Sequence, residues 1–169
     1  MSVDRTMSEE ALRRLHSEAV AITADLVSID STNTGDPATI GDGETRVCRR
    51  IAEYLDEVGI ASELVESIPG RGSLFARVEG SDPDAGGLVV HGHVDVVPAV
   101  AEDWTVPPFA GEIRDGWLYG RGTVDMKNML GMTLAVIRHY RREGVVPRRT
   151  LLLAFFADEE AAGIMGAKW

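Results

Sequence analysis

Three short clusters of histidine and acidic residues carry the chemistry that this sequence can offer. They are HGHVD at residues 91–95, GRGTVDMK at residues 120–127 and DEE at residues 158–160. Together they provide an imidazole and several carboxylates, which is the ligand set that a pair of zinc ions needs, with one carboxylate left over to act as a base. The sequence therefore predicts a hydrolytic metal site assembled from segments that lie far apart along the chain.

The first cluster places a histidine and a carboxylate on one face of an extended segment. His93 and Asp95 are two residues apart, so in a strand their side chains leave the same side. A carboxylate at this spacing can accept the second ring N–H of a metal-ligating histidine, which fixes the tautomer of the ring. His91 shares this face, although a hydrogen-bonded structural histidine explains it better than a ligand does. Taken alone, the pattern is a weak signal for a metal site.

The second cluster holds Asp125 in a glycine-rich turn just before a predicted helix. A carboxylate in such a turn can extend one oxygen to each of two metal ions, or it can cap the helix. Arg121 and Lys127 flank it, and both fit solvated or ion-paired charges better than catalytic groups. The turn alone therefore leaves two roles open for Asp125.

The third cluster, Asp158, Glu159 and Glu160, directly follows a strongly apolar segment. In open α/β sheets, sites form in the crevice beyond the carboxyl ends of the strands. Adjacent glutamates point in different directions, so one can bind metal while its neighbour handles protons. The alternative for these three residues taken alone is a solvated acidic turn.

Alternating helices and strands must position these clusters. Apolar residues recur at helical spacing in three segments, and extended apolar segments lie between them. The predicted helices cover residues 8–29, 47–59 and 129–144, the predicted strands cover residues 60–68, 73–79, 87–92 and 150–157, and residues 30–43 form a loop of turn formers. The last strand is apolar throughout, which is typical of a strand covered on both faces in a parallel sheet. This order of elements predicts a layered α/β domain.

Size and charge narrow the class of protein. The 169 residues have the length of one domain, and a net charge of −10 opposes binding to nucleic acid or to an anionic membrane. The single cysteine, Cys48, rules out an internal disulfide, fits a reducing compartment and is best explained as a buried inert thiol. The N-terminal segment lacks an apolar core of signal-peptide length, and no apolar run approaches the ~20 residues of a membrane span. We therefore expect a cytoplasmic protein.

In this order and spacing, HGHVDVVP, GRGTVDMK and DEEAAGIMGAKW resemble the signatures of a family of di-zinc amidohydrolases and metallopeptidases. That family includes acetylornithine deacetylase, succinyl-diaminopimelate desuccinylase, aminoacylase-1 and carboxypeptidase G. The resemblance implies that His93 ligates one zinc ion, that Asp125 bridges both ions and that Glu160 ligates the other, with cobalt as a possible substitute metal. It also implies that Glu159 is the general base, that Asp95 orients the site and that the peptide bond between Asp125 and Met126 is cis.

The implied reaction is hydrolysis of an amide or peptide bond in a small N-acyl amino acid or a dipeptide, by a zinc-bridging water whose proton passes to Glu159. The implied fold is a layered helix–sheet–helix domain of the zinc-exopeptidase type, with a mixed and mostly parallel sheet. On this interpretation, residues 1–169 form an incomplete, N-terminal portion of the catalytic domain.

Family members carry two further ligands downstream, an acidic residue and a histidine, and an inserted lid domain that mediates homodimers. We therefore expect incompletely liganded metal ions, weak metal binding and little or no turnover by this polypeptide alone. The alternative is a non-catalytic truncated domain that binds metal weakly or binds a partner protein. A nucleotide-binding α/β domain is a poor third, because no phosphate-cradling glycine motif follows the first strand. The sequence does not identify the substrate.

Overall fold

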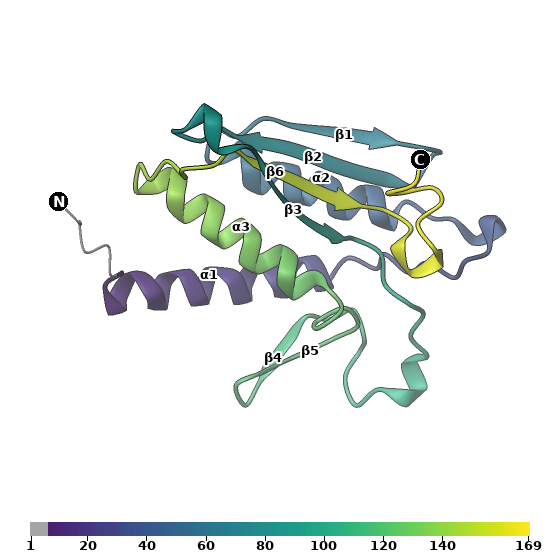
Figure 1. Cartoon of the computed structure of the whole chain (residues 1–169). Coiled ribbons are helices and arrows are strands. Elements are labelled where there is room, and N and C mark those ends of the chain that lie inside the picture. The colour runs from purple at the N-terminus through teal and green to yellow at the C-terminus, as the bar shows by residue number, and fades with distance from the viewer. Residues whose placement is uncertain (1–6) are drawn as a thin grey trace.

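The computed structural model describes residues 7–169, and at its centre lies a four-stranded sheet in the order β1–β2–β6–β3 (Figure 1). Residues 1–6, the start of the charged N-terminal segment, lie outside the described residues. The strands of this sheet are β1 (Ser62–Glu66), β2 (Gly72–Val78), β3 (Leu88–His93) and β6 (Leu151–Phe156). A separate hairpin pairs β4 (Glu112–Arg114) with β5 (Trp117–Tyr119), around the Asp115-Gly116 turn. Each predicted strand is therefore confirmed to within a few residues.

The sheet is mixed, as expected, but the expectation of a mostly parallel sheet is wrong for the described residues. β1 pairs with β2 and β2 with β6 in antiparallel directions, whereas β3 and β6 run parallel. The short turn at residues 67–71 can join only antiparallel strands. The long connection from β3 to β6, which contains a helix, permits the parallel pair. That parallel pair matters most for function, because it brings the two strand ends with histidine and acidic residues to the same edge.

Three α-helices accompany the sheet: α1 (Glu9–Val27), α2 (Gly43–Asp56) and α3 (Lys127–Arg142). Ser8 caps α1 as expected, since its hydroxyl accepts a hydrogen bond from the Ala11 amide at 3.1 Å. α1 and α3 lie against each other along much of their length (Figure 1). Gly131 permits this close packing, because a Cβ there would lie 2.2 Å from Thr23 Oγ1.

One face of the sheet carries the core. Alternate residues of β2 and β6 point into a single apolar cluster with residues of all three helices, including Leu26, Val47, Ile51, Leu74, Leu134, Leu153 and Phe155. The opposite face is open, and Val89 on it is 56% exposed. Within residues 7–169 the helices therefore supply one layer against the sheet, so the expected helix–sheet–helix arrangement is present here as two layers.

Two further expectations concern the interior and the membrane. Cys48 is fully buried, and burial raises the pKa of its thiol, which keeps it protonated and inert as predicted. None of the helices within residues 7–169 combines the length and apolar content that crossing a bilayer requires.

Leu153 tests whether the one-sided core stabilises the fold. Its side chain is 1% exposed on β6, between β2 and β3. Leu153→Ala removes buried methyl groups and leaves a cavity, so we expect the free energy of unfolding in urea to fall by about 2–5 kcal/mol. Leu12→Ala, at a position that is 50% exposed on α1, is the control and should change it by less than about 0.5 kcal/mol. Equal losses in the two variants would contradict this account of the core.

Candidate metal centre

The candidate centre lies where the parallel strands β3 and β6 end side by side. His93 is the last residue of β3 and pairs in register with Phe156, the last residue of β6. Asp158, Glu159 and Glu160 follow that strand, and Asp125 comes from the loop before α3. The carboxyl ends of two parallel strands share one edge of the sheet, so chain order brings the three sequence clusters to a common place.

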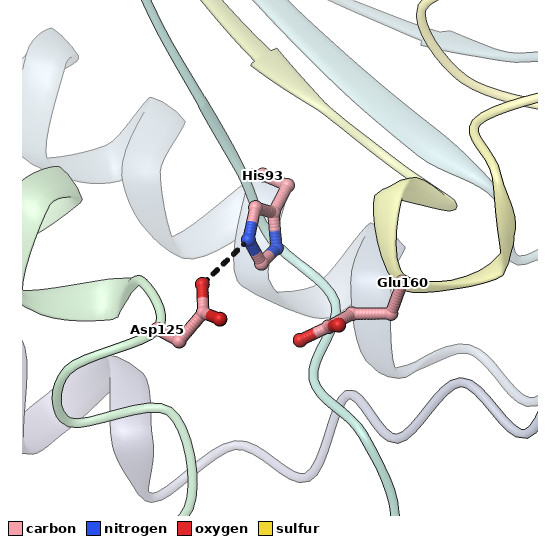
Figure 2. Close-up of side chains that lie close together, drawn as sticks. All are labelled: His93, Asp125 and Glu160. Atoms are coloured by element: carbon pink, nitrogen blue, oxygen red, sulfur yellow. Dashed lines mark hydrogen bonds and ion pairs between the residues drawn. The ribbon is translucent and has the colours of Figure 1, made fainter.

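The geometry brings together the residues that the sequence singled out as ligands. Atoms of His93, Asp125 and Glu160 that can bind metal all lie within 4.8 Å of one another. Figure 2 shows the carboxylates of Asp125 and Glu160 beside the ring of His93, whose Nε2 lies 3.0 Å from Asp125 Oδ1. Glu159 is close as well, with Oε2 3.7 Å from the same nitrogen. The cis peptide between Asp125 and Met126 is present as expected.

The donor set fits zinc or cobalt. One imidazole and two carboxylates are ligands that both ions accept, and in this cluster His93 is buried, Asp125 is exposed and Glu160 is half-buried. Partial burial raises the pKa of Glu160, and the negative charges of Asp125, Asp95 and Glu159 raise it further against the opposing effect of His93. A cation at this point would relieve the repulsion between the carboxylates, which is the electrostatic condition for a metal site.

The neighbouring carboxylates raise the pKa of the His93 ring. Burial lowers the pKa of its ring, but the hydrogen bonds and charge of Asp95, together with the hydrogen bond to Asp125, raise the pKa to about 9. A metal-ligating imidazole must be neutral, so protons and metal ions compete for this nitrogen.

Asp95 is the organising carboxylate beneath the cluster. It is fully buried, its main-chain oxygen lies 3.0 Å from His93 Nδ1, and its Oδ1 lies 3.3 Å from the same nitrogen. Its two carboxylate oxygens also accept hydrogen bonds from the backbone amides of Glu159 at 3.1 Å and Glu160 at 3.0 Å. Burial raises the pKa of Asp95, and the hydrogen bonds from His93, Asn33 and Glu160 outweigh it, so the net shift is downward. Asp95 therefore contacts both the histidine segment and the glutamate segment.

Three residues that support the cluster were missed or misjudged from the sequence. Asn33 lies in the loop at residues 30–43 and Arg71 lies between two predicted strands, yet both are buried. Asn33 donates to Asp95 at 2.9 Å, and Arg71 donates in turn to Asn33 at 2.8 Å. Lys127 was expected to be solvated or ion-paired, which is wrong. It is fully buried, and its Nζ donates to the carbonyls of Leu26 at 2.9 Å and Ile29 at 2.8 Å.

The burial of Lys127 has a clear local cause. Leu26 lies in the last turn of α1 and Ile29 lies two residues beyond its end, where main-chain carbonyls lack the amide partners of a helix interior. The amine of Lys127 donates a hydrogen bond to both carbonyls. Burial lowers the pKa of Lys127 to about 7, against the opposing charges of Asp30 and Asp95. Lys127 thereby fixes the start of α3, and with it the loop of Asp125, to the end of α1.

His91 lies outside the cluster of ligands. It is exposed on the open face of the sheet, where its ring lies 6.4 Å from that of Phe156. Its exposure does not fit the expected hydrogen-bonded structural histidine, and it is not one of the three residues whose ligand atoms lie together.

Comparisons with known proteins agree with this arrangement. The model of peptidase family M20/M25/M40 matches residues 89–169, which include all three clusters. N-fatty-acyl-amino acid synthase/hydrolase PM20D1 of Xenopus tropicalis is 40% identical over 129 residues, which are 73% of this chain and 25% of that protein. Succinyl-diaminopimelate desuccinylase of Delftia acidovorans is 32% identical over 156 residues, which are 90% of this chain and 38% of that protein.

The fold also has a counterpart among solved structures. Human carnosine dipeptidase 1 superposes with a TM-score of 0.76 at 24% identity, over 93% of this chain and 36% of that one. The chain thus spans between a quarter and two fifths of the length of these proteins.

The pKa of Glu44 allows a test of the electrostatics around Asp95, because the charge of Asp95 is one cause of its shift. Burial and the charge of Asp95 raise its pKa to about 8, against the opposing effect of Arg71. The folded chain therefore holds this proton up to about pH 8, whereas the unfolded chain releases it near the usual pKa of 4.5. The stabilising effect is complete below pH 4.5 and is lost as the pH rises towards 8.

We expect the free energy of unfolding to fall by up to about 1.4 kcal/mol per pH unit between pH 5 and pH 8 on account of Glu44. Glu44→Gln stays neutral in both states and should remove this part of the slope. The measurement is urea denaturation of both proteins in chelator-containing buffers across that range. Identical slopes for the two proteins would show that Glu44 is not buried in its protonated form.

Proposed function

This chain belongs to peptidase family M20/M25/M40, and from this premise we propose that it contributes the metal ligands and the general base of an amide or peptide hydrolase. His93, Asp125 and Glu160 are the proposed ligands, Glu159 the proposed base and Asp95 the residue that orients the site. The observation that carries the proposal is the convergence of one imidazole and two carboxylates within 4.8 Å, from three segments distant in sequence.

Each proposed residue has a position suited to its role. Asp125 offers one oxygen to the side of His93 and keeps the other free, as a bridging carboxylate requires. Two zinc or cobalt ions, when bound by these residues, would supply Lewis acidity to the scissile carbonyl. Glu159 is the carboxylate left over, and its side chain is 61% exposed beside the cluster, where it can reach a water molecule. It would take a proton from the attacking water and return it to the leaving amine.

Asp95 would act on His93 and on the glutamates together. By receiving the ring N–H of His93, it keeps the other ring nitrogen directed at Asp125. Because Asp95 also accepts hydrogen bonds from the backbone amides of Glu159 and Glu160, it holds the proposed base and a proposed ligand at a fixed position relative to the His93 ring. Positioning of this kind is a large part of what a protein contributes to catalysis.

The proposed substrate class is a small N-acyl amino acid or a dipeptide. The two curated relatives bear names that refer to N-fatty-acyl amino acids and to succinyl-diaminopimelate, and we transfer only the class of acylated amino compound that these names share. We propose no nucleic-acid or membrane partner, on the ground of the net charge of −10. We also propose a cytoplasmic location, on the ground of composition, and a homodimer for the complete protein, on the ground of the family resemblance.

We also propose that residues 1–169 correspond to the N-terminal portion of the relatives' catalytic domain. Catalytic zinc normally has three protein ligands, whereas the residues proposed here give each ion two, with Asp125 shared. We therefore expect weak metal binding and little turnover by this polypeptide by itself. A non-catalytic domain that binds metal weakly or binds a partner protein is the competing proposal, and it also predicts little turnover by this polypeptide.

Metal titration tests the ligand assignment. We expect isothermal titration of the purified chain with zinc or cobalt to show binding that Asp125→Ala weakens at least about tenfold, because this variant removes a first ligand of both ions. Glu102→Gln, which removes a carboxylate from an exposed 3-10 turn outside the cluster, is the control and should bind as the unaltered chain does. The same affinity in the unaltered chain and in Asp125→Ala would sink the proposed centre.

Glu159→Gln separates the enzyme from the non-catalytic domain. In the longest natural chain that contains these residues, we expect the variant to keep its metal content and to lose at least about 100-fold in hydrolysis of N-acyl amino acids, because a glutamine cannot accept the proton. Hydrolysis that does not depend on Glu159 would remove it as the base. Failure of that longer chain to hydrolyse any N-acyl amino acid or dipeptide would favour the non-catalytic domain.

A further inference from the structure

We propose that Asn33 is a positioning residue of the metal centre, and that its amide ties the segment after β3 to the segment after β6. The inference deepens the proposed function and rests on it, because it assigns to Asn33 and Arg71 the task of fixing His93 relative to Glu159 and Glu160. Asn33 touches none of the proposed ligands itself. It acts through Asp95 and Asp158, the neighbours of those ligands.

The contacts of Asn33 span both segments. Its side-chain nitrogen donates to Asp95 Oδ2 at 2.9 Å and to Asp158 Oδ1 at 3.0 Å. Asp95 contacts His93 and lies two residues after it, and Asp158 immediately precedes Glu159. Asn33 is 4% exposed, so these hydrogen bonds are made away from water, where a lost partner is costly.

The orientation of the Asn33 amide is fixed by its other side. Its oxygen lies 2.8 Å from Arg71 Nη2 and 3.0 Å from the backbone nitrogen of Gly35. Both of these groups can only donate, so the oxygen must face them and the NH2 group must face the two carboxylates. All four hydrogen-bonding positions of the amide are thereby used. An amide in this state has one orientation, which is what a positioning device needs.

Charge explains why a neutral donor stands at this point. The buried carboxylates of Asp95 and Asp158 both converge on the Asn33 NH2 group, and Arg71 Nη2 lies 3.8 Å from Asp158 Oδ1. Arg71 also pairs with Glu44 on its other side. The guanidinium of Arg71 supplies the positive charge of the network. The neutral amide of Asn33 donates to the carboxylates of Asp95 and Asp158 without adding another charge.

The backbone around Asn33 is itself anchored to the sheet. The Asn33 amide donates to Val96 O at 2.9 Å, the Val96 amide donates to Ser31 O at 3.1 Å, and Ser31 Oγ donates to Val94 O at 2.7 Å. Residues 31–33 therefore run beside the segment after β3 as a short parallel pairing. On the far side, Asp158 Oδ2 accepts the amide of Met165 at 2.9 Å, which leaves Asp158 little freedom.

The consequence is a continuous connection from the turn before β2 to the glutamates. Arg71 holds Asn33, Asn33 holds Asp95, and Asp95 accepts the amides of Glu159 and Glu160. Removing the Asn33 donor should release Asp95 and loosen those two amides, even though the apolar core stays intact. A residue that merely fills space would give a different result, because an isosteric replacement would then be tolerated.

Asn33→Asp makes the test, since it keeps size and shape but replaces the donor with a carboxylate. We expect amide hydrogen exchange at Glu159 and Glu160, measured by NMR in the presence of a chelator, to become at least about tenfold faster than in the unaltered chain. Exchange at core amides such as Leu153 should change less than at these two positions. Asn128→Asp is the matched control: it adds the same charge in the first turn of α3 without touching Asp95 or Asp158, and should leave both amides unchanged.

Asn33→Ser keeps the inference testable if the aspartate variant does not fold. A serine hydroxyl can donate to only one of the two carboxylates, so we expect an intermediate and local increase in exchange at Glu159 and Glu160. Unchanged exchange at these amides, or an equal increase at Leu153, would overturn the positioning role.

A cobalt titration distinguishes this failure from failure of the proposed function. We expect Asn33→Asp to weaken cobalt binding at least about tenfold and to alter the visible absorption spectrum of the bound ion, since the ligands would no longer be held at one separation. If the unaltered chain binds no cobalt, the proposed function fails. The exchange rates of the Glu159 and Glu160 amides then still show whether Asn33 holds this segment in place. If it binds cobalt and Asn33→Asp binds it equally with the same spectrum, the inference fails and the proposed function stands.

Discussion

A carboxylate that is fully buried must be surrounded by donors, and the way in which Asp95 meets this requirement shapes the whole site. Its donors come from Asn33 and from the backbone of Glu159 and Glu160, with the ring of His93 beside them. Asn33 comes from the loop after α1, and the amides of Glu159 and Glu160 come from the segment after β6, whereas His93 ends the strand that precedes Asp95. Satisfying one buried charge therefore assembles the loop, the histidine and the glutamates in a single arrangement, because each of them would otherwise leave Asp95 short of a partner.

The sheet makes this arrangement possible by a simple topological means. β3 and β6 are the one parallel pair among the described strands, and they end at the same edge. The apolar core contributes as well. Leu153, Phe155 and their neighbours pack β6 against the helices, and this packing determines where the end of β6 lies. The polar network beneath the cluster is built on this frame, with Arg71 entering from the turn before β2 and Lys127 joining α3 to α1.

The parts of this structure that sequence reasoning recovered are those in which a local pattern has a direct physical meaning. The convergence of His93, Asp125 and Glu160 was predicted because potential metal ligands are few in kind, stood at the ends of apolar segments and lay in motifs that resemble those of a known family. Asn33 was not, because residues 30–43 give only a turn signal, and its partners are 62 and 125 residues away. The direction of the strands was misjudged because the apolar run of β6 suggested a parallel sheet covered on both faces, whereas the described residues cover one face only.

Lys127 has a wider consequence through the helix on which it rests. α1 contains 19 residues, which corresponds to about 28 Å of helix. Lys127, two positions after Asp125, donates to the carbonyl of Leu26 in the last turn of α1 and to that of Ile29 just beyond its end. A displacement of the C-terminal end of α1 would therefore be expected to move the loop that carries Asp125. The effect of a tag, a fusion or a surface substitution at the start of α1 should therefore be measured as a change in metal affinity. An unchanged melting temperature would not show that the metal centre is undisturbed.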